Sequence, residues 1–388
     1  MKKKTFAILG STGSIGKSSL SVIKKLKNTK VLLIVVNKNF REALNQIRIY
    51  RPRVVVVNSS KTFKKLKKNF KNKKIIILND YKKSKKYLKK IDVTISAIPG
   101  INGLEPTIFF TAISKKVLIA NKESIICGWA LIKAKAKKFK TKLIPIDSEH
   151  FSINFLLKNY PSNQINKIYI TASGGPFLFL DKNSFNKIKP SQATKHPKWK
   201  MGKKISIDSS TLMNKVLEII EAVKLFSISL DKFKIVVHPQ SLVHSILELK
   251  NGLRILLYHE TDMRIPIANA IEDFNKNLAD FDFKYKEISK KLTFLPVDKT
   301  KFPVEEIIKK IDVNNSSPIL INAANEIIVD QFLKKKIKFI EIFKYLKLFL
   351  NTIAYIKTSK IKANSIEKVR KIDLIGRQLA LKIINSNV

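Results

Sequence analysis

Two carboxylates, Asp147 and Glu149, follow the apolar run 143–146, which predicts the end of a buried strand. In extended backbone, side chains two residues apart point to the same side. Carboxylates aimed at one point repel each other unless a cation lies between them, and hard oxygen ligands favour Mg²⁺ or Mn²⁺ over zinc. An isolated pair of this kind is also typical of a solvated acidic turn. The pair therefore indicates a metal site only if other residues support it.

A second polar set lies in the segment 205–222, where apolar residues recur at helical spacing. We expect Asp208 or Ser209 to cap this helix. Four polar side chains fall at i, i+1, i+4 and i+7 and share one face: Asn214, Lys215, Glu218 and Glu221. Ser209 and the first two of these can hold a phosphate, while Glu218 can reach a metal. The alternative is an amphipathic helix with a polar stripe on its surface.

A glycine-rich turn lies near the N-terminus, where Gly10, Gly13 and Gly16 have the spacing G-x-x-G-x-x-G. A strand is expected before it at 5–9, and a helical pattern begins after it near Ser18. In this order of strand, glycine turn and helix, backbone N–H groups can hold the pyrophosphate of a dinucleotide.

A second strand, expected at 31–36, ends in Asn37, Lys38 and Asn39. Proteins that bind NAD usually have Asp or Glu here, which binds the ribose 2′-hydroxyl. A cation and two amides instead favour the 2′-phosphate, so we predict NADP(H) rather than NAD(H).

Continuous apolar runs recur in the first part of the chain, and Lys-rich helical stretches separate several of them. Such runs are typical of parallel strands that are buried on both faces. They lie at 54–57, 75–78, 93–98, 117–120 and 143–146. Residues 1–147 are therefore expected to form one doubly wound, Rossmann-like α/β domain. Lys122 follows the strand at 117–120, at a carboxyl end of the sheet, where such domains bind ligands.

The pattern changes after residue 150. A strand at 168–171 leads into Ser173 and two glycines, which offer a hydroxyl and exposed amides to a phosphate or an oxyanion. The irregular segment 179–201 carries His196 and Trp199 and is expected to form a mobile lid over a substrate.

Strands are expected at 235–238, 243–249 and 253–259, the last two as a hairpin around Asn251 and Gly252. They add an antiparallel edge and a surface for a dimer, and the pattern is helical from 304 onwards. We therefore expect an N-terminal Rossmann-like domain, a central α+β catalytic domain with the lid, and a C-terminal helical bundle. The expected ranges are 1–147 for NADPH binding, 148–274 for catalysis, metal binding and dimerisation, 275–303 for a linker and 304–388 for the bundle.

The formal net charge of +47 raises the alternative of a nucleic-acid-binding protein. Nearly all of the positive charge is Lys spread over every segment, whereas proteins that read bases rely on clustered Arg. This spread favours solvated surfaces and no nucleic-acid partner. The apolar runs are shorter than the ~20 residues of a membrane span, and the N-terminal run is too short for an export signal. We expect a cytoplasmic protein without a membrane partner.

The single cysteine, Cys127, allows neither an internal disulfide nor a thiolate metal cluster. Its apolar neighbours favour a buried structural thiol. A catalytic thiol at this position would instead fit a different NADP-dependent enzyme, such as a semialdehyde dehydrogenase, which needs no metal.

Nine short stretches, spread along nearly the whole chain, resemble the motifs of the 1-deoxy-D-xylulose 5-phosphate reductoisomerase family. They occur in the same order as in that family. They are 10–16, 121–124, 147–150, 173–177, 196–202, 208–221, 238–241, 262–264 and 322–326, the last of which is expected to open a long helix. The resemblance implies a homodimer that converts 1-deoxy-D-xylulose 5-phosphate and NADPH to 2-C-methyl-D-erythritol 4-phosphate, in the non-mevalonate route to isoprenoids.

The resemblance also implies roles for the residues at matching positions. The divalent metal, Mg²⁺ or Mn²⁺, would be bound by Asp147, Glu149 and Glu218. The substrate phosphate and its neighbouring oxygens would be held by Ser173, Ser209, Asn214 and Lys215, with Glu218 one turn further. The reacting part of the substrate would contact Lys122, Ser148 and Glu149, and His196 and Trp199 would close over it from the lid. Catalytic roles fall to Lys122, Glu149 and His196, and the choice of proton carrier between the first two stays open. NADPH would be surrounded by Thr12, Gly13, Ser14, Ile15, Asn37, Lys38, Asn39, Asn121, Glu123, Met201 and Gly202.

Three positions depart from the family pattern. Asn37, Val216 and Ala172 each stand where a glycine is usual. None of these departures removes a functional group.

Overall fold

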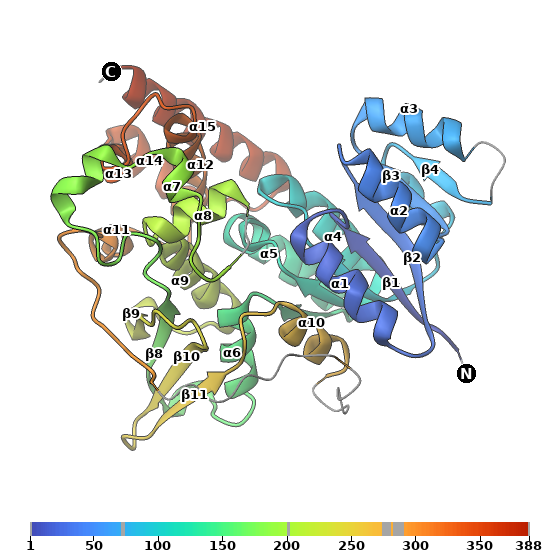
Figure 1. Cartoon of the computed structure of the whole chain (residues 1–388), viewed down its shortest axis with the longest axis horizontal. Coiled ribbons are helices and arrows are strands. Elements are labelled where there is room, and N and C mark those ends of the chain that lie inside the picture. Colours follow the sequence, from blue (N-terminus) through green and yellow to red (C-terminus); the bar gives the residue numbers. More distant parts are fainter. Residues whose placement is uncertain (1, 71–73, 200–201, 274–280, 282–290, 387–388) are drawn as a thin grey trace. The chain divides into compact units, whose positions relative to one another are not determined.

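A parallel sheet of seven strands organises the N-terminal part of the chain (Figure 1). The computed structural model describes residues 2–70, 74–199, 202–273, 281 and 291–386. The strand order is β4-β3-β2-β1-β5-β6-β7, and all six pairings are parallel, which confirms the doubly wound, Rossmann-like α/β prediction. The strands are β1 (Lys4–Leu9), β2 (Thr29–Val36), β3 (Val54–Val57), β4 (Ile76–Leu78), β5 (Ile91–Ser96), β6 (Ser114–Ile119) and β7 (Lys142–Pro145).

Helices cover both faces of this sheet. They are α1 (Ser14–Lys25), α2 (Phe40–Tyr50), α3 (Ser60–Asn69), α4 (Leu104–Ile113), α5 (Lys122–Phe139) and α10 (Arg264–Ile271), with the short 3₁₀ helices η1 (Tyr81–Lys86) and η2 (Ile101–Gly103). Side chains along β1 alternate between the faces. Phe6 and Ile8 share a core with α1, α2, α3 and α10, whereas Ala7 and Leu9 share a core with α4.

Helix α10 joins this core from far along the chain. Its residues Ile267 and Ile271 are fully buried against the sheet. Lysines meet its C-terminal end: Lys4 Nζ donates to the Ile271 carbonyl at 2.9 Å, and Lys116 Nζ donates to the same carbonyl at 3.1 Å and to the Asp273 carboxylate at 2.7 Å. Cations at this end also interact favourably with the helix dipole.

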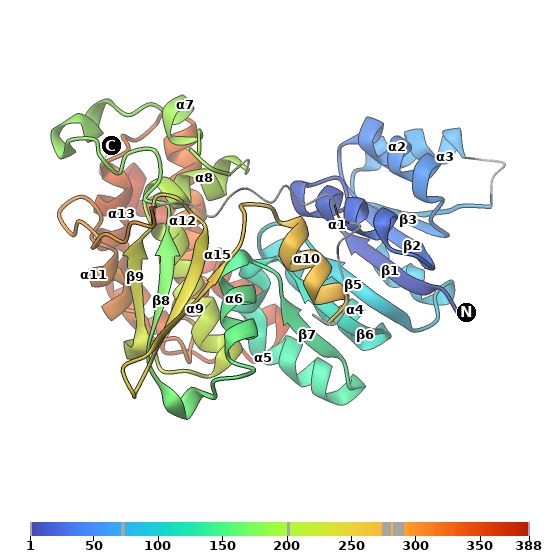
Figure 2. The ribbon, with the colours of Figure 1, turned by 60° about the horizontal axis from the view of Figure 1, so that its bottom comes forward.

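The chain forms two compact units. The described residues of 1–124, 130–151 and 262–285 make up the first, and those of 125–129, 152–261 and 286–388 make up the second. The second unit has a four-stranded sheet of order β11-β10-β8-β9. Figure 2 shows β8 and β9 of this sheet next to each other. Its strands are β8 (Ile165–Ala172), β9 (Phe233–Val237), β10 (Val243–Leu249) and β11 (Arg254–Tyr258). β8 and β9 are parallel, and β10 and β11 form the predicted hairpin around Gly252, whose φ is +87°.

One face of this second sheet is covered by α6 (Ser148–Leu156) and α9 (Met213–Phe226). Ile153 from α6 and Ile219 from α9 pack with Ile168, Ile170 and Leu247 of the strands. The remaining elements between the strands are η3 (Ser162–Gln164), η4 (Lys182–Lys187), α7 (Pro190–Ala193), α8 (Lys203–Ser210) and η5 (Leu230–Lys232).

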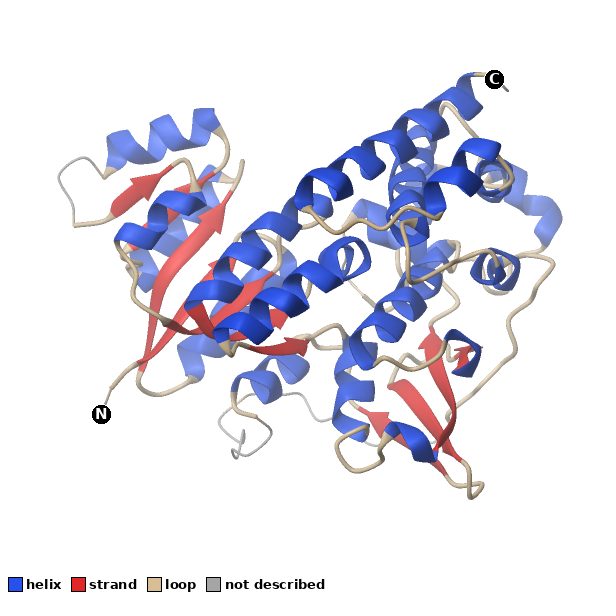
Figure 3. Ribbon diagram, turned by 180° about the vertical axis from the view of Figure 1, so that it is seen from behind, coloured by secondary structure: helices blue, strands red, loops and turns tan. Residues whose placement is uncertain are grey.

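The chain ends in helices, as predicted for residues after 304. They are α11 (Val304–Lys309), α12 (Ser317–Leu333), α13 (Glu341–Leu350), α14 (Ile353–Ser359) and α15 (Ile366–Asn385). Figure 3 shows α15 as the long helix that runs to the C-terminus. It packs closely on α12, because a Cβ on Gly376 would lie 3.0 Å from the Ala323 Cβ and 3.3 Å from the Leu320 Cα.

Two predicted helix starts are wrong by about one turn. α1 begins at Ser14 rather than near Ser18, directly after Gly13. α12 begins at Ser317 rather than at 322, because Pro318 in its first turn has a φ that suits a helix start and lacks only an N–H that would be unbonded there. About half of the linker expected at 275–303 lies outside the described residues. Within it, Leu295 forms an antiparallel bridge with Val237.

Asp92 joins β5 to β1 near the amino ends of these two central strands. Its Oδ2 accepts from the Thr5 N–H at 2.9 Å and from the Thr5 hydroxyl at 2.7 Å, and its Oδ1 lies 2.8 Å from Lys115 Nζ. Burial opposes ionisation of Asp92, but the bonds from Lys115 and Thr5 outweigh it and lower the pKa from 3.8 to about 2. The ionised carboxylate therefore stabilises the fold above pH 4, and this stability is lost as the pH falls towards 2.

We expect Asp92→Asn to lower the free energy of unfolding at pH 7 by about 1–2 kcal/mol, after allowance for partial exposure. The difference between the variant and the parent should shrink between pH 4 and pH 2, because the parent loses its charge there. Urea unfolding at several pH values measures this. A difference that stayed constant down to pH 2 would contradict the ionised pairing.

Candidate functional site

In the glycine turn between β1 and α1, the backbone of Gly16 lies very close to that of Gly10. Gly10 has a φ of +84°, and a Cβ on Gly16 would lie 2.5 Å from the Gly10 carbonyl oxygen. Gly13 precedes α1 and has no side chain to cap it, so the first N–H groups of the helix can bind an anion. The predicted residues Thr12 to Ile15 lie in this turn and in the first turn of α1.

Gln46 of α2 holds the turn, and sequence reasoning missed it. It accepts from the Ser11 hydroxyl at 2.7 Å and donates to the Ser11 carbonyl at 2.9 Å. One signal in the sequence could have found Gln46. It is an uncharged polar residue directly before Ile47, on the face of α2 that is buried.

The segment after β2 carries the three residues expected near the 2′-phosphate. Asn37, Lys38 and Asn39 are exposed. Asn39 caps α2, because its Oδ1 accepts from the Glu42 N–H at 3.1 Å. Asn37 does not adopt a positive φ, so replacing the usual glycine causes no left-handed strain.

Lys122, Asp147, Ser148 and Glu149 meet within the first unit. Lys122 Nζ lies 3.3 Å from Asp147 Oδ2, and the Ser148 hydroxyl donates to Glu149 Oε2 at 2.6 Å. The expectation of extended backbone through Glu149 was wrong. The Asp147 carbonyl accepts from the Phe151 N–H at 2.8 Å, so Asp147 is the last residue before α6 and Glu149 lies in its first turn. An acidic residue before a helix and another in its first turn is the usual pattern of a helix start.

Asn121 and Glu123 lie at the start of α5, next to Lys122. The Asn121 Oδ1 caps the helix by accepting from the Ser124 N–H at 2.8 Å, and its Nδ2 donates to Glu123 Oε2 at 2.9 Å. Both predicted cofactor residues are thus at the carboxyl end of β6, where open α/β sheets bind ligands.

The segment 205–222 forms two helices rather than one, so neither Asp208 nor Ser209 is an N-cap. Both lie in the last turn of α8. The break comes at Thr211, whose hydroxyl donates to the Ile207 carbonyl at 3.0 Å, and at Leu212, which has a φ of +56°. α9 then starts at Met213.

The polar face of α9 is buried, which excludes a surface stripe. Glu218 is only 1% exposed. Its Oε1 accepts from Asn214 Nδ2, and its Oε2 lies 2.7 Å from Lys215 Nζ. Asn214, Lys215 and Glu221 are buried as well. Keeping charged groups out of water is costly unless they are paired, and here Asn214 and Lys215 both pair with Glu218.

Ser173 and His196 are brought together after β8. The Ser173 hydroxyl lies 2.9 Å from His196 Nε2, and His196 Nδ1 accepts from the Trp199 N–H at 2.9 Å. Because Nδ1 accepts, Nε2 carries the proton and donates to Ser173. The Trp199 ring packs edge-on against His244. Gly202 immediately precedes α8, whereas Met201 lies outside the described residues.

Gly175 packs directly beneath the end of α8. It has a φ of +65°, and a Cβ on it would lie 2.9 Å from the Ser210 Cα and 3.1 Å from the Ser209 carbonyl oxygen. We expect Gly175→Ala to lower the free energy of unfolding by roughly 2–3 kcal/mol, the sum of backbone strain and this clash. Thermal or urea unfolding measures the change.

Gly252→Ala is the matched control, because Gly252 has a φ of +87° but no atom within 4 Å of an added Cβ. It should show the backbone strain alone. Equal losses in the two variants would mean that contact with α8 contributes nothing.

Cys127 is buried within α5, as predicted for a structural thiol. Of the described helices, none combines the length and the apolar character that crossing a bilayer requires.

Models of known families match most of the chain. The model described as 1-deoxy-D-xylulose 5-phosphate reductoisomerase matches residues 6–128, that of its C-terminal domain matches 143–226, and that of the DXP reductoisomerase C-terminal domain matches 259–379. The 1-deoxy-D-xylulose 5-phosphate reductoisomerase of Pelagibacter ubique (strain HTCC1062) is 41% identical over 99% of this chain and 100% of its own. That of Wolbachia from Drosophila simulans is 38% identical over 99% of both.

Solved structures of reductoisomerases are also similar to this chain over nearly its whole length. The Zymomonas mobilis reductoisomerase in complex with NADPH matches with a TM-score of 0.88 and 31% identity over 99% of this chain and all of its own. A DOX-P reductoisomerase in complex with NADPH, fosmidomycin and magnesium matches with a TM-score of 0.89 and 29% identity over 98% of both chains. The chain therefore belongs to the 1-deoxy-D-xylulose 5-phosphate reductoisomerase family.

Proposed function

We propose that this chain is an NADPH- and divalent-metal-dependent enzyme that converts 1-deoxy-D-xylulose 5-phosphate to 2-C-methyl-D-erythritol 4-phosphate. The observation that carries the proposal is the match over 98–99% of the chain to reductoisomerases, which include a relative at 41% identity and solved structures in complex with NADPH, fosmidomycin and magnesium. The product belongs to the non-mevalonate route to isoprenoids.

NADPH fits the first unit. The uncapped start of α1 and the glycine turn suit its pyrophosphate, and the exposed Lys38 suits its 2′-phosphate. The proposed contacts are Thr12, Gly13, Ser14, Ile15, Asn37, Lys38, Asn39, Asn121, Glu123, Met201 and Gly202.

The donors proposed for the metal are the carboxylates of Asp147, Glu149 and Glu218. An all-oxygen set of three negative charges suits Mg²⁺, as in the magnesium-bound relatives, and also Mn²⁺. Lys122, 3.3 Å from Asp147, and Lys215, 2.7 Å from Glu218, partner two of these carboxylates in the structure. When bound, the ion supplies Lewis-acid stabilisation of negative charge on substrate oxygens.

The phosphate of the substrate is assigned to the second unit. Ser173, Ser209, Asn214 and Lys215 supply hydroxyl, amide and ammonium donors, and such charge-assisted bonds are strong away from water. Binding the phosphate orients the distant carbon atoms that react. His196 and Trp199 are proposed to close over the substrate and exclude water.

The reaction breaks one carbon–carbon bond, forms another and then reduces an aldehyde with the hydride of NADPH. A negative charge develops when the first bond breaks, and a proton must be held or moved nearby. Lys122, Glu149 and Ser148 are the candidates for contacts with the reacting atoms. The two proton carriers kept open are Lys122 and Glu149.

The test is NADPH oxidation with 1-deoxy-D-xylulose 5-phosphate, with and without Mg²⁺ or Mn²⁺. We expect turnover that a chelator abolishes and that either ion restores, and that thiol alkylation leaves unchanged. Loss of activity on alkylation without a metal requirement would instead favour a dehydrogenase that uses Cys127. Tight, salt-sensitive DNA binding without turnover would favour a nucleic-acid-binding protein.

We also propose a homodimer through the edge strand β11 and a cytoplasmic location. β11 is the outer strand of its sheet, so its unpaired backbone groups can pair with a second copy. Leu253 just before it is 59% exposed and Leu256 within it is 41% exposed. Cell fractionation tests the location.

Leu256→Arg should convert the dimer to a monomer in sedimentation velocity, because it places a charge at the centre of this edge. Leu374→Arg, at an exposed apolar position on α15, is the control and should leave the dimer intact. A dimer that survives Leu256→Arg would place the interface elsewhere.

A further inference from the structure

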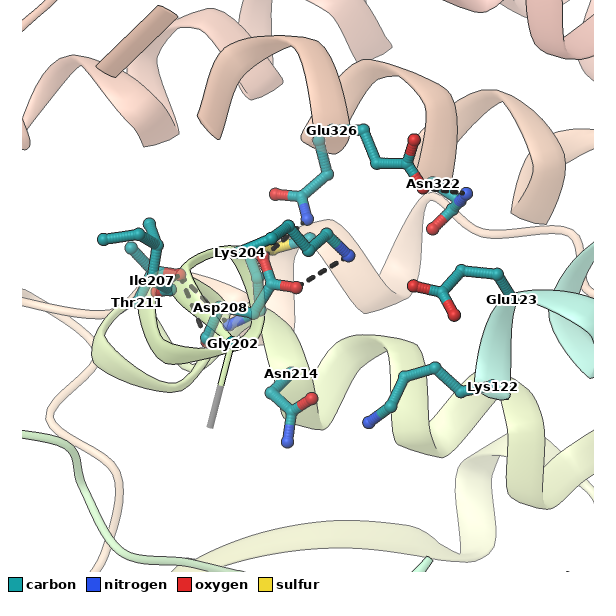
Figure 4. Close-up of polar contacts among 12 residues, drawn as sticks. Lys122, Glu123, Gly202, Lys204, Ile207, Asp208, Thr211, Asn214, Asn322 and Glu326 are labelled. Atoms are coloured by element: carbon teal, nitrogen blue, oxygen red, sulfur yellow. Dashed lines mark hydrogen bonds and ion pairs between the residues drawn. The ribbon is translucent and has the colours of Figure 1, made fainter. Parts of the chain in front are cut away.

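Asp208 is a buried carboxylate that does not cap a helix and has no part in the proposed reaction. It lies in the last turn of α8 and is 1% exposed. Its Oδ1 accepts from Asn325 Nδ2 of α12 at 2.8 Å. Its Oδ2 lies 2.7 Å from Lys204 Nζ (Figure 4). A carboxylate removed from water in this way needs both partners.

Asn325 is an unusual residue for its place in α12. It is fully buried, and its Oδ1 finds no hydrogen-bond partner among the described residues. A buried acceptor without a partner destabilises a fold, so an apolar residue would be expected there. The bond from Nδ2 to Asp208 gives the amide a function, and the acceptor role of Asp208 fixes which end of the amide faces it.

Asp208 is also the residue directly before the proposed phosphate-binding segment. The chain leaves α8 through a fixed turn, in which the Leu212 N–H donates to the Ser209 carbonyl at 3.2 Å and the Lys215 N–H donates to the Leu212 carbonyl at 3.0 Å. Thr211 reinforces the turn, because its hydroxyl donates to the Ile207 and Asp208 carbonyls. A small shift of Asp208 therefore moves Ser209 and the start of α9 together.

We propose that Asp208 is a positioning residue for the substrate phosphate. By binding Asn325 it ties the end of α8 to α12, and it thereby holds Ser209, Asn214 and Lys215 in place before the phosphate arrives. Preorganised donors bind an anion more tightly, because no ordering is needed on binding. This inference rests on the proposed function for the identity of the substrate, but the anion site itself can be tested without turnover.

The first test uses Asn325→Leu, which removes the amide but keeps the volume. We expect the KM for 1-deoxy-D-xylulose 5-phosphate to rise about tenfold, while kcat and the KM for NADPH change by less than about threefold, because the loss of one hydrogen bond to a charged group weakens only phosphate binding. Protection by inorganic phosphate against thermal unfolding should need about tenfold more phosphate, at constant ionic strength. Asp208→Asn should behave in the same way.

The swapped pair Asp208→Asn with Asn325→Asp provides the rescue. It restores an amide–carboxylate bond with its direction reversed, so phosphate affinity should return to within about threefold of the parent. Lys204→Ala, at a partly exposed position, should raise the phosphate requirement by about threefold without unfolding the protein. Lys203→Ala removes the same charge at the neighbouring exposed position. It should leave both the substrate KM and the phosphate requirement unchanged.

A lower unfolding temperature with unchanged phosphate protection and unchanged KM would overturn the proposal, because Asp208 would then only brace the fold. No rescue by the swapped pair would overturn it as well. If the variants shift phosphate protection as expected while the parent protein shows no turnover, the anion site is correct and the proposed function is wrong.

Discussion

Glu218→Gln should abolish metal-dependent turnover while leaving NADPH binding intact. The carboxamide keeps the size of the side chain and one acceptor oxygen for Asn214, but it removes the negative charge that faces Lys215 and the proposed ion. Losing one of three charged metal ligands is expected to cost about 4 kcal/mol of transition-state stabilisation, or roughly 10³-fold in kcat/KM. Steady-state kinetics at several Mg²⁺ concentrations, with fluorescence titration of NADPH, measures both effects.

Glu306→Gln is the control for this change. Glu306 is an exposed carboxylate on α11 that pairs with Lys347 at 2.7 Å, and its loss should leave the kinetics unchanged. Turnover of the Glu218 variant within tenfold of the parent at saturating Mg²⁺ would remove this residue from the metal site.

Lys215→Ala should raise the KM for the phosphorylated substrate by roughly 10²-fold and change kcat less. The reason is that a charge-assisted bond to phosphate is worth about 1.5–3 kcal/mol and is present in both ground and transition states. The change also leaves the buried Glu218 without its cation, so a lower unfolding temperature is expected. Kinetics with varied substrate, and inhibition by inorganic phosphate, separate the two effects.

Lys203→Ala again serves as the charge control, because Lys203 is exposed at the start of α8. An unchanged substrate KM in the Lys215 variant, together with an unchanged response to inorganic phosphate, would count against its role in binding phosphate.

The parallel sheet could be predicted from the sequence because its strands are buried on both faces. Val54–Val57 is the clearest example, since all four residues are fully buried. The hairpin of β10 and β11 could be predicted for a different reason, because Asn251 and Gly252 form a turn signal between two apolar runs. Helix starts were less accurate, because the spacing of apolar residues does not mark where a helix begins.

The break between α8 and α9 could not be predicted. A left-handed residue is usually signalled by Gly or Asn, and here it is Leu212. Its N–H donates to the Ser209 carbonyl and its own carbonyl accepts from the Lys215 N–H. The bond between Asp208 and Asn325 spans 117 positions of the sequence and depends on how α8 packs on α12. Spacing alone also left the polar face of α9 undecided between a site and a surface stripe, and its burial excludes the surface stripe.

The return of α10 to the first sheet affects how the protein is made. During translation, the seven strands emerge from the ribosome more than a hundred residues before Ile267 and Ile271, which complete one of their two apolar faces. The nascent N-terminal segment therefore exposes part of its future core while the second unit is still being synthesised, and such surfaces bind chaperones or aggregate. A fragment that stops at residue 150 would lack this helix and should be far less soluble than the full chain.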